Sequence, residues 1–98
     1  DVEFRVANPV LDPIAKADLI IMKDVLQHLP TEHVRTLLQK VGRSCRWALI
    51  TNDSCVDNGP DIAVGGYRPI NVMRPPFDVP GITLLAYGKK RTILSGPY

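Results

Sequence analysis

Residues 17–38 read ADLIIMKDVLQHLPTEHVRTLL. The apolar run Leu19–Met22 is typical of a strand that is buried on both faces of a parallel sheet. The run ends at Lys23 and Asp24, and open α/β sheets bind their ligands at the carboxyl edge of their strands. A short turn then leads into an amphipathic helix. We therefore expect half of a βαβ unit here, with any functional site centred on residues 23–28.

A helix is expected over residues 31–42. Pro30 suits the start of a helix, Thr31 can cap it, and Glu32 complements the positive end of the helix dipole. Four apolar residues recur at the spacing of one helix face and should pack on the sheet: Val34, Leu37, Leu38 and Val41. Gly42 is a natural C-terminal stop.

Two further strands are expected around this unit. Residues 2–7 alternate apolar with charged side chains, which predicts a strand with one polar face that ends at Asn8-Pro9. Residues 47–50, WALI, predict a second buried strand, and the polar run Thr51–Ser54 follows it.

The last third of the chain divides into a loop and a hairpin. Residues 55–81 contain five prolines, four glycines and no clear period, so they predict a long irregular excursion. Loops of this length inside compact domains are usually functional or disordered. Residues 82–87 and 91–94 flank Gly88-Lys89-Lys90 and predict an antiparallel hairpin.

Size and charge exclude several classes of protein. A chain of 98 residues forms one small domain, and a net charge of +2 is too small to indicate a nucleic-acid partner. The basic run Lys89–Arg91 is better explained as a solvated turn. The chain contains no apolar run of the roughly 18 residues that cross a membrane and no signal peptide, so no membrane partner is expected.

The two cysteines, Cys45 and Cys55, predict reduced thiols and a cytoplasmic location, because a domain with its own core does not need a disulfide framework. With two histidines at no ligand-like spacing, they do not predict a metal site. Neither cysteine has a histidine nearby in sequence, so nucleophilic catalysis is not expected.

Four blocks carry a resemblance to a known family: Ala17–Ile20, Lys23–Leu29, Gly65–Asn71 and Pro75-Pro76-Phe77. They resemble the C-terminal half of a class I S-adenosylmethionine-dependent methyltransferase. The combination of the first two blocks with the last two resembles a narrower bacterial-type subgroup of that family, without a settled substrate. The likeness spans nearly all of residues 1–98. It implies an α/β fold, the C-terminal half of a Rossmann-like sheet, with parallel strands followed by an antiparallel hairpin.

Two parts of that family's cofactor site have no counterpart in this sequence. They are the glycine-rich loop after the family's first strand and the acidic residue that ends its second strand. Gly65-Gly66 is not that loop, because no buried strand precedes it and no helix follows it. The resemblance therefore implies that residues 2–7 correspond to the family's third strand, and that the isolated chain binds S-adenosylmethionine weakly or not at all.

The resemblance also assigns roles to individual residues. Asn8 stands where the family often has an aspartate that contacts the adenine amine, and its carbonyl can still accept that bond. Lys23 stands at the end of the family's fourth strand, at the position of a residue whose backbone approaches the cofactor. The segment Asp24–His28, with Val25 facing the cofactor, would line the cofactor and substrate pocket.

Several of these residues have a structural interpretation as well as a functional one. His28 is a candidate general base, or it holds the turn before the helix by a backbone hydrogen bond. Asp24 touches the substrate or orients the loop, or it caps the helix. Tyr67, Arg68 and Asn71 bind an anionic group of the substrate, or they brace the long loop.

The expected function is S-adenosylmethionine-dependent methyl transfer to an unidentified small-molecule or protein acceptor, with Asp24 and His28 as catalytic residues. The alternative is a non-catalytic, partner-binding fragment of the same fold. A nucleotide-binding oxidoreductase shares the architecture, but the phosphate-binding loop that it needs is missing.

One consequence for assembly follows from the resemblance. In the family's sheet the third and fourth strands are not neighbours, so strand 18–22 would expose an apolar edge. Strand 2–7 then collapses against that edge, or two copies pair into a homodimer through it. We expect the dimer.

Overall fold

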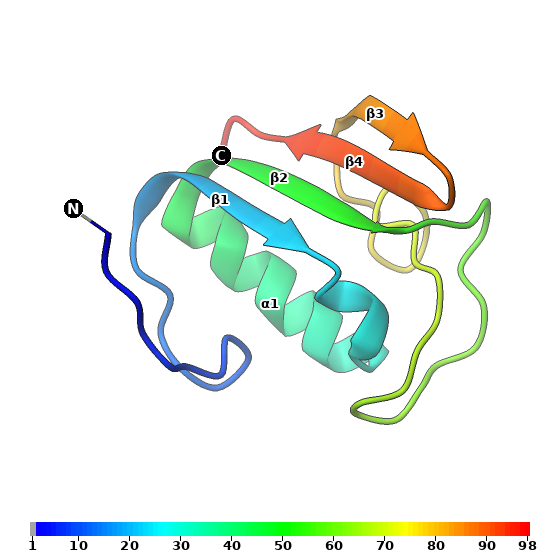
Figure 1. Ribbon diagram of the computed structural model, residues 1–98, viewed down its shortest axis with the longest axis horizontal. Helices are drawn as coiled ribbons and strands as arrows, with labels where there is room; N and C mark the ends of the chain where they lie inside the picture. The colour runs from blue at the N-terminus through cyan, green and yellow to red at the C-terminus, as the bar shows by residue number, and fades with distance from the viewer. Residues whose placement is uncertain (1) are drawn as a thin grey trace.

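The computed structural model describes residues 2–98 and consists of one mixed sheet with one long helix (Figure 1). The sheet has four strands in the order β1-β2-β4-β3. Its elements, in chain order, are β1 (Ala17–Lys23), the 3₁₀ turn η1 (Leu26–His28), α1 (Thr31–Ser44), β2 (Cys45–Asp53), β3 (Ile82–Tyr87) and β4 (Lys90–Ser95).

The expected half of a βαβ unit is confirmed. β1 and β2 pair in parallel, from Ala17 opposite Cys45 to Lys23 opposite Thr51, and α1 connects them. β4 runs antiparallel to both β2 and β3, so the C-terminal hairpin is confirmed too. The fold is therefore a small α/β domain with parallel strands followed by an antiparallel hairpin.

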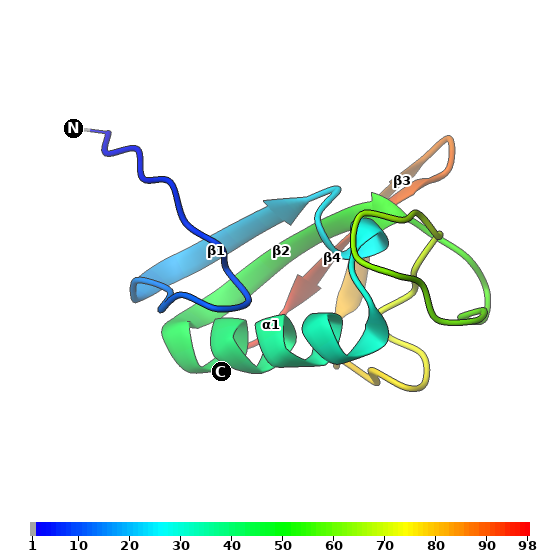
Figure 2. The ribbon, with the colours of Figure 1, turned by 90° about the horizontal axis from the view of Figure 1, so that it is seen from below.

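The apolar stripe of α1 packs on one face of the sheet and forms the core (Figure 2). Val34, Leu37 and Val41 are fully buried there, against Ala48 and Ile50 of β2. Fully burying side chains of this size contributes about 1.5–3 kcal/mol each. The apolar face of α1, which repeats every 3.6 residues, thus packs on the apolar face of the strands, which repeats every two residues, and the two faces form a single core.

α1 begins where the sequence predicts but is capped by a different residue. Thr31 is the first helical residue, and its backbone N–H donates to Oδ1 of Asp61 at 2.8 Å. The cap therefore comes from the long loop, and the expectation that Thr31 caps the helix is wrong. The helix also continues past Gly42 to Ser44, with the ring of Tyr98 packed closely over Gly42.

β1 is not buried on both faces, which corrects the interpretation of its apolar run. Met22 is buried on the α1 side, but Leu19 is 46% exposed and Ile21 is 65% exposed on the other side. The only long helix in residues 2–98 covers one face of the sheet, so the opposite face has no covering layer.

The strand predicted at residues 2–7 is wrong. These residues form no strand, and Phe4 is 91% exposed. An alternating pattern needs a neighbouring strand to pair with, and none lies beside this segment in the described chain. β1 consequently forms one edge of the sheet.

The long excursion is irregular, as predicted, but it is packed rather than loose. Ile70 and Val72 are buried in the core, and the N–H of Ile70 donates to the carbonyl of Asp53 at 2.8 Å. The N–H of Arg68 donates to the carbonyl of Gln27 at 3.0 Å. These contacts hold the loop across the carboxyl ends of β1 and β2. Across residues 2–98, no helix combines the length and the apolar character needed to cross a membrane.

Candidate ligand site at the carboxyl edge

The carboxyl ends of β1 and β2 meet at one edge of the sheet, and β4 starts at the same edge. Lys23 lies opposite Thr51, and Lys90 of β4 lies opposite Asp53. Asp24 follows β1 with a positive φ of 57°, and its N–H donates to the carbonyl of Thr51 at 2.9 Å. Asp and Asn adopt this left-handed conformation more readily than most residues. Asp24 thereby turns the chain sharply out of the sheet.

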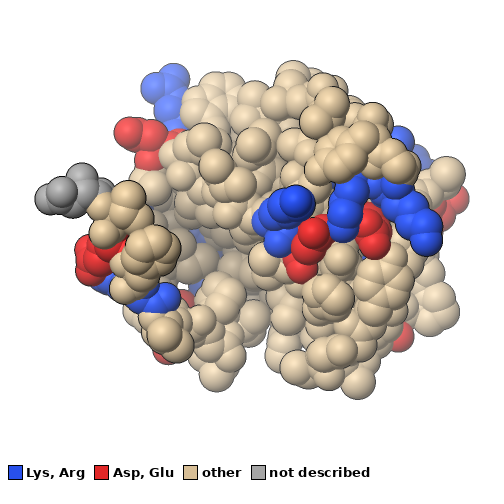
Figure 3. Space-filling model, viewed as in Figure 1, with Lys and Arg blue, Asp and Glu red and all other residues tan. Residues whose placement is uncertain are grey.

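Four side chains from four segments meet at this edge and form what we call the carboxyl-edge cluster: Asp24, Asp53, Tyr67 and Lys90. The Nζ of Lys90 donates to Oδ1 of Asp24 at 2.5 Å and to Oδ1 of Asp53 at 2.8 Å. The hydroxyl of Tyr67 donates to Oδ2 of Asp53 at 2.7 Å. Figure 3 shows acidic and basic side chains gathered in one row over the ends of these strands.

Contacts within the cluster shift the pKa values of Lys90, Asp53 and Tyr67 away from neutral pH. Hydrogen bonds to Asp24 and Asp53 raise the pKa of Lys90. The hydrogen bond from Lys90, and then that from Tyr67, lower the pKa of Asp53. The hydrogen bond to Asp53 raises the pKa of Tyr67. Lys90 is therefore a fixed cation, Asp53 a fixed anion, and Tyr67 a hydrogen-bond donor that does not act as a base.

His28 lies beside the cluster, and one of its ring nitrogens is engaged. Its Nδ1 lies 3.0 Å from the carbonyl oxygen of Gly66, and its ring centroid is 6.0 Å from that of Tyr67. Because a carbonyl oxygen only accepts, this bond places a proton on Nδ1. In the neutral ring Nε2 then carries the lone pair. The structural and the functional interpretation of His28 are thus compatible, since one nitrogen holds the loop and the other is left to accept a proton.

Gln27 is a buried residue of the site that the sequence pattern did not reveal. Its Oε1 accepts the N–H of Asp53 at 2.8 Å, and its backbone carbonyl accepts the N–H of Arg68. It thereby ties η1 to the end of β2 and to the long loop. Asp53 and Lys90 were also missed. The signal for Asp53 was the polar run that follows a buried strand. Lys90 belongs to the basic run that was interpreted as a solvated turn, but it lies in β4 and pairs with two carboxylates that are distant in sequence.

Arg68 lies outside the cluster and braces the loop. Its side chain is 9% exposed. Its Nη1 donates to the carbonyl of Pro60, and its Nη2 donates to the carbonyl of Leu29 and to Oγ1 of Thr31, at 3.1–3.2 Å. These partners lie in the long loop, between η1 and α1, and at the first residue of α1, so the contacts of Arg68 support the bracing interpretation.

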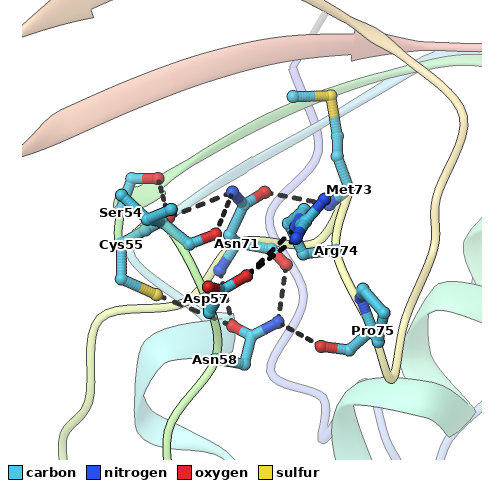
Figure 4. A network of polar contacts seen from close by, with 9 residues as sticks. Ser54, Cys55, Asp57, Asn58, Asn71, Met73, Arg74 and Pro75 are labelled. Atoms are coloured by element: carbon cyan, nitrogen blue, oxygen red, sulfur yellow. Dashed lines mark hydrogen bonds and ion pairs between the residues drawn. The ribbon is translucent and has the colours of Figure 1, made fainter.

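Asn71 also makes its contacts within the loop (Figure 4). Its Nδ2 donates to the carbonyl of Cys55 at 3.0 Å, and its Oδ1 accepts the N–H of Met73 at 3.1 Å. Asn58 joins the same network by donating to the carbonyls of Asn71 and Pro75 at 2.8 Å. The amide side chains of Asn58 and Asn71 thus join residues 55–58 of the excursion to residues 71–75.

The structure does not bring Asn8 to the cluster. Asn8 closes a turn with Asp12, and Lys40 of α1 holds this turn through the carbonyls of Val10 and Asp12. Lys40 lies in the C-terminal half of α1, at the end of the helix away from the carboxyl edge. Lys23 is exposed at the end of β1, and Val25 packs partly against the core.

A hollow of about 620 Å³ opens beside the cluster, next to the β3–β4 turn. Lys90 and Arg91 line it together with Cys55 and Asn71. Both cysteines are free thiols, and burial raises the pKa of each. In the described part of the chain, no three His, Cys, Asp or Glu side chains converge as a metal site would require. The edge thus offers fixed charges, a hydrogen-bond donor and one imidazole nitrogen.

Comparison with known proteins gives no match, since no family model, curated protein or solved structure is significantly similar to the chain.

Proposed function

We propose that this chain forms the C-terminal half of a class I methyltransferase-like domain and takes part in S-adenosylmethionine-dependent methyl transfer to an unidentified acceptor. The observation that carries the proposal is the carboxyl edge itself. The segment Lys23–His28, which bears the resemblance, leads directly from the parallel pair β1–β2 to the carboxyl-edge cluster. The antiparallel hairpin that follows also agrees with the order of elements implied by the resemblance.

The chemistry makes few demands on the protein. The sulfonium of S-adenosylmethionine is an activated electrophile, so the chain has to align the acceptor and take up its proton. His28 is the residue suited to the second task, because its Nδ1 is engaged by Gly66 and its Nε2 is left to accept the proton. The ring of Tyr67, whose centroid lies 6.0 Å from that of His28, connects His28 to the carboxyl-edge cluster, because the Tyr67 hydroxyl donates to Asp53.

Ligand-observed NMR with S-adenosylhomocysteine at millimolar concentration tests the proposal. Saturation transferred from the protein should reach the adenosine protons in the presence of the full chain. Asp24→Asn should reduce that transfer several-fold, because it removes a charge of the cluster without changing the size of the side chain. Asp57→Asn is the matched control, since Asp57 pairs with Arg74 on the surface at 2.9 Å. Equal transfer with the wild type and Asp24→Asn, or no transfer, would contradict the proposal.

The second candidate is a non-catalytic fragment that binds a partner, and the uncovered face of the sheet favours it. Leu19 and Ile21 of β1 and Ile82 and Leu85 of β3 are exposed on that face. An apolar surface of this kind commonly marks an interaction site. Saturation transfer to adenosine that depends on Asp24 would distinguish the enzyme from this alternative.

A further inference from the structure

β1 has an edge that no other strand of the described residues occupies. It pairs with β2 on one side, and no other strand of residues 2–98 pairs with it. Its outward backbone groups therefore form a template for a further strand. The side chains at this edge on the face opposite α1 are Leu19 and Ile21, and both are exposed.

The uncovered face continues from β1 across the whole sheet. The register places Trp47 beside Leu19 and Leu49 beside Ile21, and Leu94 of β4 lies opposite Leu49. Figure 3 looks onto this face, where the charged side chains gather in the row at the carboxyl edge and otherwise lie towards the rim and on the N-terminal segment. The free edge of β1 therefore borders an apolar surface that a further strand would extend and partly cover.

The same chain contains a segment with the pattern of the missing strand. Val2, Phe4 and Val6 alternate with Glu3 and Arg5, and the three apolar side chains are almost fully exposed. Six residues of extended chain span about 20 Å at ~3.3 Å per residue, which suits pairing along β1. The exposed apolar row is unfavourable in water, and the unpaired edge is a template that can bind it, so pairing the two buries apolar surface.

The base of this segment is held in place on its own molecule. The N–H of Asp12 donates to the carbonyl of Asn8 at 2.8 Å, and Lys40 of α1 donates to the carbonyls of Val10 and Asp12 at 2.5 and 3.1 Å. From this turn the segment runs away past β1, towards the side of the sheet opposite α1 (Figure 2). The tether on α1 and this direction favour the edge of another copy over the segment's own β1.

We propose that residues 2–7 of one copy add as an antiparallel strand to the free edge of β1 in a second copy. The exchange is reciprocal and gives a dimer with twofold symmetry. Each copy supplies the strand that the other lacks, so the interaction is closed and leaves neither β1 edge free.

Charge and side-chain pattern select one register for this pairing. With Phe4 opposite Leu19, Val2 falls opposite Ile21, and all four side chains extend the apolar face. Arg5 then falls directly opposite Asp18, an arrangement of opposite charges that stabilises cross-strand pairs. In a parallel arrangement with Phe4 beside Leu19, Glu3 would instead stand beside Asp18, and the two carboxylates would repel each other.

Disulfide cross-linking between separately prepared chains tests the register. Val6 falls opposite Ala17, so a Val6→Cys chain mixed with an Ala17→Cys chain should form a mixed disulfide under mild oxidation, with Cys55→Ser in both chains. Val6→Cys mixed with Lys23→Cys is the control and should not form one, because Lys23 lies at the other end of β1. Identifying the joined peptides by mass spectrometry distinguishes the products. Equal linkage in both mixtures, or linkage only within a chain that carries both Val6→Cys and Ala17→Cys, would overturn the proposal.

Sedimentation equilibrium tests the dimer without cysteines. The wild-type chain should dimerise, and Phe4→Asp should raise the dissociation constant at least tenfold. Phe4 is 91% exposed, so this change should leave the fold of the single copy intact, as circular dichroism can verify. Val64→Asp is the matched control, because Val64 is exposed on the long loop, and it should leave dimerisation unchanged. A wild-type monomer at several hundred micromolar, or a dimer indifferent to Phe4→Asp, would refute the proposal.

Discussion

Arg68→Met should destabilise the fold, because the guanidinium of Arg68 joins the long loop to the start of α1. The substitution keeps an apolar stem of similar length and removes the guanidinium. It thereby removes the hydrogen bonds to the carbonyls of Pro60 and Leu29 and to Oγ1 of Thr31. These groups join the long loop to the start of α1, so their loss loosens the connection between the two.

The size of the effect follows from these contacts. A hydrogen bond from a charged donor contributes about 1.5–3 kcal/mol net. The three bonds share one guanidinium and are not additive, and Nε of Arg68 is buried without a partner in the described chain, which reduces the benefit. The ion pair with Asp61 spans 3.8 Å to an exposed carboxylate and adds little. We expect a loss of about 2–3 kcal/mol in the free energy of unfolding.

Urea unfolding followed by circular dichroism measures this loss. With a slope of about 1–2 kcal/mol per molar urea for a chain of this size, the midpoint should fall by roughly 1–3 M. Arg74→Met is the matched control, because Arg74 pairs with Asp57 on the surface, where the two side chains are 56% and 70% exposed. It should change the stability by less than ~1 kcal/mol. Equal midpoints for the two variants would refute the bracing role of Arg68.

Three further predictions concern the candidate site. The pKa of Asp53 is lowered chiefly by the hydrogen bond from Lys90. The ionised carboxyl therefore stabilises the fold above its unfolded-state pKa of about 3.9, and this stability is lost as the pH falls through the lower folded-state pKa. Asp53→Asn should accordingly lower the melting temperature at pH 7. The difference in melting temperature between this variant and the wild type should shrink below about pH 4, and a difference that does not depend on pH would contradict this prediction. Calorimetric titration with S-adenosylhomocysteine should show only millimolar affinity, because the glycine-rich loop and the ribose carboxylate have no counterpart in the chain, and micromolar affinity would show that they are not needed. His28→Asn should retain more stability than His28→Ala, because its amide can still donate to the carbonyl of Gly66, and equal melting temperatures would show that this bond does not hold the loop.

Periodicity predicted the parts of the fold that depend on local pattern. The apolar run of β1, the stripe of α1 and the polar turn between β3 and β4 each specify an element that the structure contains. Periodicity could not predict which faces of the sheet are covered by helices, because that depends on how many helices the chain supplies. The alternation in residues 2–7 was misleading because a strand also needs a neighbouring strand to pair with, and the local pattern does not show whether one is present.

The candidate site was predictable at the level of the strand ends, and less so at the level of its contacts. Asp24 and His28 follow directly from the position of β1 and η1. Lys90 is 66 residues from Asp24 in sequence, so only the order β2-β4 of the sheet brings the two together. Arg68 and Asn71 share the sequence block of Tyr67, yet they point into the loop network and Tyr67 points to Asp53. Local sequence does not encode that divergence.

An amide chemical-shift map of the full chain, with S-adenosylhomocysteine added to millimolar concentration, shows directly whether the carboxyl edge binds the ligand. If the carboxyl edge is the ligand site, the shifts should concentrate in residues 23–28 and 51–54 and at Tyr67, and Asp24→Asn should diminish them. Shifts confined to the turn at residues 8–12 or to other surfaces, or a spectrum unchanged by the ligand, would contradict the account.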